Sequence, residues 1–226
     1  MEREQKSMNV KKIKTEKKVL LAMPVAKGDI SQETFNSVLG LDFCGSIRTL
    51  GGSLVDDARE KLAEDAINEG YTHVLWTDSD MVFEHDALNK LLEDDKDIVT
   101  GICFKRVPPY TPAIYKCGQV YIDYPKDSLF EVDECGFGFI LTKVSALKEV
   151  LDECGGMFQR AYPFGEDISF CKRWRELTKK TGMPHTIWCD SRVKIGHVGT
   201  TIVTERTFEL STAKLMEMQK CQKETK

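Results

Sequence analysis

The feature that most constrains the fold of this sequence is an apolar run that ends in two aspartates. The run His73–Thr77 is apolar and β-prone, and Asp78 and Asp80 follow it directly. A run of this length and composition predicts a buried strand of a parallel sheet. Ligands of open α/β sheets bind outside the carboxyl ends of such strands, and carboxylate oxygens suit Mg²⁺ or Mn²⁺, which in turn hold diphosphates. A loop that only caps the next helix, Asp86–Leu92, would also explain the pair of aspartates.

The segments around this run alternate between strand and helix. A first strand is predicted at Val19–Pro24, and a third at Asp97–Phe104. Between them, residues 54–67 show helical periodicity, and Ser53 and Asp56 form a predicted capping box at the start of this helix. This alternation predicts a single α/β domain with Rossmann-like winding, a mostly parallel central sheet and flanking helices.

The second half of the chain has shorter elements, which predict a small antiparallel region beside the main sheet. They include a glycine-containing strand at Cys135–Leu141 and a helix that opens at Glu166. The other expected elements are a helix at Ser31–Leu39 capped by Ser31, a helix at Ser145–Glu153, short strands around 185–189 and 193–195, and a polar helix at Glu205–Cys221. The chain is thus divided into a leader over residues 1–18, one domain over 19–204, and a C-terminal polar helix or tail over 205–226.

The composition is that of an ordinary globular protein. The 226 residues are 41% hydrophobic and 30% charged. Residues 1–18 carry seven basic and three acidic side chains without aromatic residues, which favours a disordered leader over contact with nucleic acid or a membrane. The apolar run 19–26 contains a proline and breaks at Lys27, and no run approaches the ~18 residues that span a bilayer. Eight dispersed cysteines without a Cys-x-x-Cys pair predict reduced thiols in a cytoplasmic protein.

Six short segments at predicted strand and helix ends carry a resemblance to a known family. The segments are Val19–Pro24, Ala58-Arg59, Trp76–Phe83, Gly136–Phe139, Phe164–Phe170 and Gly196–Gly199. Taken in this order, they resemble glycosyltransferases with the GT-A fold, most closely the family 2-like enzymes of bacteria and their phages. The resemblance covers roughly residues 19–200. It implies a GT-A fold, with an antiparallel region on the acceptor side, and metal-dependent transfer of a sugar from a nucleoside-diphosphate sugar to an acceptor.

The resemblance also implies a metal site. Asp80 would bind the ion directly, Asp78 would position the ribose and the metal shell, and His197 would be a third ligand. The ion would be Mn²⁺ or Mg²⁺, which neutralises the leaving diphosphate, and a neutral imidazole suits Mn²⁺. Without the resemblance, an ordinary surface or core histidine would be the favoured interpretation of His197.

Further residues are expected on the donor side of the site. Pro24 and Ser79 belong to segments that carry the resemblance, and Arg59 lies on the long helix where it would reach the nucleotide. A surface ion pair with Asp56 or Asp57 is the alternative for Arg59. Lys105 and Arg106 follow a predicted strand end in a proline-rich loop, where they are candidates to contact donor or acceptor.

The acidic pair Glu166-Asp167 resembles the family's acceptor-side carboxylates. Asp167 is the candidate general base if the reaction inverts the anomeric centre, and Glu166 is expected to orient groups. Both acids also complement the dipole of the helix that they open. Tyr162 or Phe164 would offer a stacking surface for a sugar, and Phe137 is expected on the acceptor side. Trp76 and Trp174 are interpreted as core residues.

Two other functions compete with this hypothesis. Asp78–Val82 also fits the signature of haloacid dehalogenase-type phosphatases, in which Asp78 would be the nucleophile and Asp80 the general acid/base. In that fold, however, the strand with the motif normally comes first. A catalytically silent nucleotide- or sugar-binding protein is the other alternative, and the joint presence of the candidate metal ligands and Asp167 argues against it.

Overall fold

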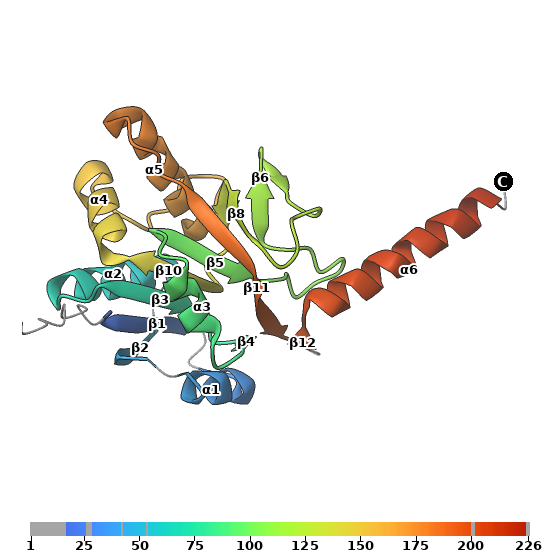
Figure 1. The fold of residues 1–226 in the computed structure, drawn as a ribbon, viewed down its shortest axis with the longest axis horizontal. Helices are drawn as coiled ribbons and strands as arrows, with labels where there is room; N and C mark the ends of the chain where they lie inside the picture. Colours follow the sequence, from blue (N-terminus) through green and yellow to red (C-terminus); the bar gives the residue numbers. More distant parts are fainter. Residues whose placement is uncertain (1–16, 26–28, 42, 53, 200–201, 225–226) are drawn as a thin grey trace, which may run out of the picture.

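The central sheet is built on a strand whose residues are buried throughout. This computed structural model describes residues 17–25, 29–41, 43–52, 54–199 and 202–224 (Figure 1). In β1 (Val19–Val25), Leu20 and Ala22 contribute to the core on one face of the sheet, while Leu21 and Met23 contribute to the core on the other face. A strand covered on both faces must be apolar at every position, which is why β1 shows no polar alternation.

The main sheet contains nine strands among the described residues. Besides β1 they are β2 (Gly45–Gly51), β3 (His73–Thr77), β4 (Met81–Phe83), β5 (Ile98–Ile102), β8 (Leu129–Val132), β10 (Phe139–Lys143), β11 (Ile187–Val198) and β12 (Ile202–Val203). Their order is β12-β11-β5-β10-β3-β1-β2, with β4 and β8 also paired to β11. Strands β1, β2, β3, β5 and β11 run parallel, and β10 runs antiparallel between β3 and β5. The predicted mostly parallel α/β sheet is confirmed.

Helices cover both faces of this sheet (Figure 1). α2 (Val55–Asn68), α4 (Val144–Cys154) and α5 (Glu166–Thr181) pack on one face, and α1 (Gln32–Leu39) and α3 (Ala87–Glu93) pack on the other. A second sheet of β7 (Gln119–Val120), β6 (Ile114–Lys116) and β9 (Glu134–Cys135) forms a small antiparallel region. α6 (Glu205–Glu224) leaves the body of the molecule after its first turns, where Phe208 packs on Phe104.

Several predicted elements differ in detail from the observed ones. Ser31 caps α1 as predicted, because its Oγ accepts a hydrogen bond from the Thr34 amide at 3.1 Å. The predicted capping residue Ser53 lies outside the described residues, and the N-cap of α2 is Leu54, whose side chain makes no capping bond. The expected strand 135–141 is divided between β9 and β10, because the chain passes from one sheet to the other. Most of the predicted leader, residues 1–16, also lies outside the described part.

Long-range pairing explains the elements that the sequence did not reveal. β2 is an edge strand with mostly exposed residues, so it lacks an apolar signal. β4 is three residues long and exists through its pairing with β11. The two short strands expected near 185–195 are one strand, β11, with an irregularity between Asp190 and Lys194.

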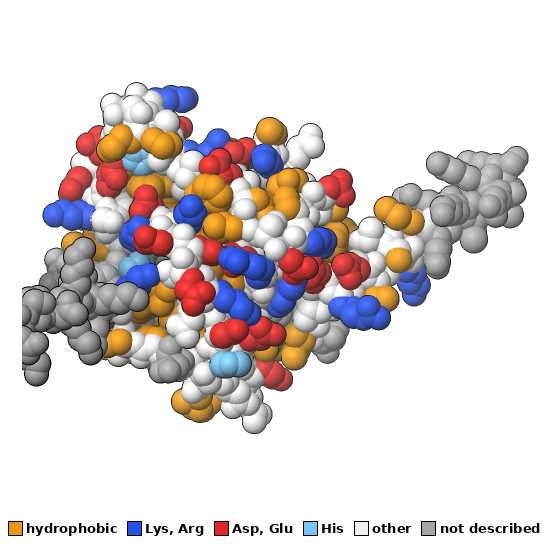
Figure 2. Space-filling view, in the orientation of Figure 1, with side chains coloured by type: hydrophobic (Ala, Val, Ile, Leu, Met, Phe, Trp, Pro, Cys, Tyr) orange, Lys and Arg blue, Asp and Glu red, His pale blue; other side chains and the backbone are white. Residues whose placement is uncertain are grey.

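The visible surface is mixed in charge (Figure 2). The face seen in Figure 2 carries acidic and basic side chains next to one another rather than a broad field of one sign. Within the described residues, no helix has the length and apolar character needed to cross a membrane.

Candidate active site

The two aspartates lie between the end of β3 and the start of β4, at the carboxyl edge of the parallel strands. The Asp78 amide donates to the Gly138 carbonyl at 3.1 Å, and the Val198 amide donates to the Asp80 carbonyl at 2.7 Å. These two bonds attach the loop that contains Asp78 and Asp80 to Gly138, just before β10, and to the end of β11. The Ser79 carbonyl accepts from the Ser31 amide at 2.9 Å, which places Ser79 beside the start of α1.

Strand pairing brings Pro24 to the same edge of the sheet. β1 and β3 run parallel, with Ala22 opposite Trp76, and Pro24 follows Ala22 towards the end at which Asp78 lies. Trp76 is fully buried, as predicted, and its indole nitrogen donates to the Thr142 hydroxyl. The parallel pairing of β1 and β3 therefore places Pro24 and the two aspartates at the same edge of the sheet.

His197 lies against Asp80 because β4 and β11 pair in antiparallel register, with His197 opposite Met81. The His197 Nε2 atom is 3.3 Å from Asp80 Oδ2, and Nδ1 is 2.7 Å from the Phe104 carbonyl oxygen. A carbonyl oxygen only accepts, so the Nδ1 atom carries the proton. In a neutral ring, the lone pair of Nε2 is then directed at the Asp80 carboxylate, an arrangement that a cation or a proton between the two would stabilise.

Positive charge also surrounds Asp80. Arg106 Nη1 lies 2.7 Å from Asp80 Oδ2, and the Arg106 side chain is mostly exposed. Burial raises the pKa of Asp80, but the hydrogen bond and charge that His197 supplies when its ring is protonated, together with Arg106, outweigh it and leave that pKa below its ordinary value. Asp80 is therefore an anion at neutral pH.

Arg59 is inside the protein rather than at its surface. Its side chain is 3% exposed, with Nη2 2.7 Å from Asp78 Oδ1 and Nε 3.3 Å from Glu166 Oε1. The guanidinium lies 5.8 Å from the Trp76 ring centroid and 5.3 Å from that of Phe137. Burial raises the pKa of Asp78, and Arg59 offsets this only in part. Arg59 thus serves as a buried counter-ion that joins the two ends of the site.

The ion pairs proposed as the alternative for Arg59 are replaced by these buried contacts. Asp56 instead pairs with Arg160, at 3.1 Å. The Nη1 atom of Arg59 is also buried, and it has no hydrogen-bond partner in the part of the chain that the structure describes.

Asp167 lies in the first turn of α5, facing the cavity that borders Asp78. Its Oδ1 atom accepts from the Ile168 amide at 2.7 Å. Burial, and then the negative charge of Glu166, raise the pKa of Asp167, which the Ile168 amide and Arg59 lower only in part. Glu166 is tied to Arg59, as described above, so Asp167 is the carboxylate of the pair that lines the cavity.

This cavity has a volume of about 230 Å³ and brings together several predicted residues. Asp78, Asp167, His197 and Lys105 line it, with Tyr115 as a further member. Tyr115, on β6, was not a predicted site residue; the sequence signal is only an aromatic residue in a short strand after the proline-rich loop. The Lys105 Nζ atom lies 5.7 Å from the Tyr115 ring centroid.

The wall of this cavity is closely packed at Gly138. A β-carbon there would lie 2.5 Å from Met81 Cε and 3.2 Å from Cys103 Sγ, so a side chain at this position would require the Met81 side chain to move. Phe137 lines the cavity and packs on Trp76. The proposed stacking residues Tyr162 and Phe164 are exposed and are not among the residues that line it.

The donor set fits a divalent ion in part. Within the described residues, no group of three or more His, Cys, Asp and Glu side chains could hold a metal ion. Asp80 and His197 are brought together, but Asp78 is turned to Arg59. Two protein ligands are enough for an ion that completes its shell with water and substrate phosphates. The Nδ1–carbonyl bond of His197 is also the contact that orients metal-binding histidines.

Comparison with solved structures identifies the fold. A197 from STIV superposes with a TM-score of 0.55 at 19% identity, covering 80% of this chain and 86% of that one. GalNAc-T7, solved with UDP, GalNAc and Mn²⁺, superposes with a TM-score of 0.53 at 9% identity, covering 82% of this chain and 44% of that one. This chain has a GT-A-like fold. No protein-family model and no curated protein matches the sequence.

Proposed function

We propose that this chain is a metal-dependent glycosyltransferase of the family 2-like type, which transfers a sugar from a nucleoside-diphosphate sugar to an acceptor hydroxyl. The observation that carries the proposal is the pair formed by Asp80 and His197. The imidazole Nδ1–H is committed to a backbone carbonyl, and Nε2 faces the carboxylate at 3.3 Å. This pair lies at the edge of the sheet where α/β folds bind ligands.

On the donor side, Asp80 and His197 would hold Mn²⁺ or Mg²⁺. The bound ion supplies positive charge to the leaving diphosphate. Lys105, in the cavity wall, and Arg106, beside Asp80, add positive charge from the protein itself. Pro24, Ser79 and Asp78 lie at the same edge, where they would border the nucleoside.

On the acceptor side, Asp167 would accept the proton of the attacking hydroxyl. It lines the cavity together with Asp78 and His197, and its raised pKa makes it a better base than an exposed aspartate. Glu166 and Arg59 would orient this end of the site through their ion pair, since neither side chain is free to react.

The phosphatase alternative agrees less well with the same contacts. Asp78 would have to attack phosphorus, but its Oδ1 atom is 2.7 Å from Arg59. In addition, β3 follows β1 and α2 in the chain, whereas the strand with the motif comes first in that fold. An assay for transfer or hydrolysis of the sugar distinguishes the glycosyltransferase from a catalytically silent binding protein.

The test is a thermal-shift screen of UDP-, GDP- and dTDP-sugars, each with Mn²⁺ or with EDTA. Binding to the folded state at 100 times Kd stabilises it by about 2.7 kcal/mol, so a metal-dependent rise in Tm is expected with one nucleotide family. Asp80→Ala should lose the rise, and Asp152→Ala, which alters an exposed aspartate of α4, should keep it.

The other outcomes separate the alternatives. A metal-dependent rise without transfer or hydrolysis of the sugar would identify a silent binding protein. No rise with any sugar nucleotide, together with hydrolysis of p-nitrophenyl phosphate in Mg²⁺, would identify a phosphatase.

A further inference from the structure

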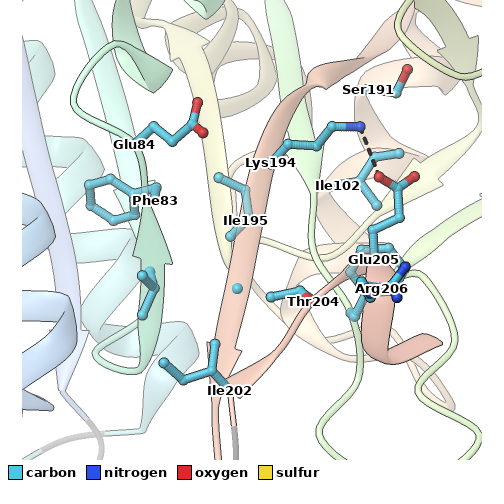
Figure 3. A pocket seen from close by; sticks show the side chains of 13 residues that line it. Phe83, Glu84, Ile102, Ser191, Lys194, Ile195, Ile202, Thr204, Glu205 and Arg206 are labelled. Atoms are coloured by element: carbon cyan, nitrogen blue, oxygen red, sulfur yellow. Dashed lines mark hydrogen bonds and ion pairs between the residues drawn. The ribbon is translucent and has the colours of Figure 1, made fainter. Parts of the chain in front are cut away.

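A second cavity lies outside the candidate active site. It has a volume of about 430 Å³ and is bordered by β4, β11, β12 and the start of α6; we refer to it as the β4–β11 cavity (Figure 3). Phe104 contributes to the walls of both cavities. None of the residues proposed for catalysis or metal binding lines the β4–β11 cavity.

The main wall of this cavity is apolar and well packed. Phe83, Ile102 and Ile195 line it and are almost fully buried, so their positions are set by the core. Figure 3 shows Phe83 on β4 and Ile195 on the neighbouring strand β11, where the two are register partners, with Ile202 near the lower end. Ile202 packs over Gly196, since a β-carbon at Gly196 would lie 2.9 Å from Ile202 Cγ2.

One side of the cavity is polar. Lys194 Nζ lies 2.8 Å from Glu205 Oε2, and this ion pair, drawn as a dashed line in Figure 3, faces the space between β11 and α6. Glu84 and Arg206 also line the cavity. The four charged side chains comprise two cations and two anions, so the lining has no net charge. An ion pair of this kind offers both a donor and an acceptor to a polar group.

The volume of the cavity indicates the size of its ligand. An apolar cavity of about 150 Å³ holds benzene, and small-molecule sites begin near 300 Å³. A cavity of 430 Å³ therefore has room for a molecule with two or three rings, or for an alkyl chain. Balanced charge disfavours a fatty acid or an alkyl ammonium ion, because either would bring one unpaired charge into an apolar site.

We propose that the β4–β11 cavity binds a neutral amphipathic small molecule. Its ring system or chain lies against Val82, Ile102 and Ile202, and its hydroxyl or amide group lies at the Lys194–Glu205 ion pair. This site does not depend on the glycosyltransferase function, since the two cavities have different linings apart from Phe104.

The experiment uses the full chain and the uncharged fluorescent probe N-phenyl-1-naphthylamine. Probe fluorescence should rise to saturation with one site per chain. Ile202→Trp enlarges a side chain at the rim and should weaken binding at least tenfold. The control, Ile122→Trp, makes the same change at a similarly exposed isoleucine outside the cavity and should alter the affinity less than twofold. Val82→Phe places a larger side chain on the β4 wall and reduces the volume of the cavity, so it should also weaken probe binding. This variant replaces Ile202→Trp as the test if Ile202→Trp does not fold.

The chemical class is tested by displacement. 1-Dodecanol should displace the probe at a lower concentration than dodecanoate or dodecylammonium. A lower effective concentration for either charged amphiphile would overturn the neutral class. The site itself would be overturned by the absence of saturable binding, or by equal affinity in Ile202→Trp, Val82→Phe and Ile122→Trp.

Discussion

Removal of the Arg59 charge should destabilise the whole fold, although Arg59 lies at the candidate active site. Arg59→Met keeps an apolar chain beside the rings of Trp76 and Phe137 but leaves two carboxylates without their counter-ion. Glu166 is only 12% exposed, and burial already raises the pKa of Asp78, so each carboxylate loses a compensating charge. Breaking a buried ion pair by removing one partner costs about 3–5 kcal/mol, and we expect a loss of unfolding free energy in this range.

The assay is urea denaturation of Arg59→Met, Glu166→Gln and the double variant at pH 7.5. If Arg59 compensates Glu166, the double variant should lose about 1–3 kcal/mol less than the sum of the single losses. Arg48→Met, which removes a more exposed arginine paired with Glu69, is the control and should change stability little. A loss below about 1 kcal/mol for Arg59→Met would refute the assignment of Arg59 as a buried counter-ion.

Two further variants test the site and the pH dependence. Asp167→Asn should reduce transfer at least about 100-fold while the donor-dependent rise in Tm remains, and full activity would contradict the assignment of the base. Burial, followed by the charge of Asp190, raises the pKa of Asp94 to about 6, so ionisation costs the native state up to about 3 kcal/mol as the pH rises from 4 to 6. Asp94→Asn should therefore be more stable than the wild type by about 1–2 kcal/mol in urea denaturation at pH 7.5, even though the substitution weakens the ion pair with Arg192. The gain should be absent at pH 4. Lower stability of the variant than of the wild type at pH 7.5 would contradict this prediction.

The position of the aspartates was predictable because the signal is local. Five consecutive buried residues form β3, and Asp78 comes at once after it, so the chain order alone places the pair at the carboxyl edge of the sheet. The same holds for the start of α1, because the capping residue Ser31 and its hydrogen-bond partner Thr34 are only three residues apart in the chain. Patterns of this length reflect backbone geometry and burial, which neighbouring residues determine.

Other contacts of the site depend on residues that are far apart in the chain. Arg59 and Glu166 are separated by 107 residues, and the sequence around either residue does not indicate that the two side chains form an ion pair. His197 reaches Asp80 through the pairing of β4 with β11, and β4 has too few residues to be recognised before its partner is known.

The sequence by itself determined the layers of this protein and the edge at which its acidic residues gather, because burial imposes an apolar pattern on each segment. Only the tertiary structure decided that Asp80 faces His197 and that Asp78 faces Arg59. It also decided where β4, β11 and α6 leave the β4–β11 cavity between them. A charge pair or a cavity wall is formed by side chains from separate elements, and their distance is set by how those elements pack rather than by the residues next to them in the chain.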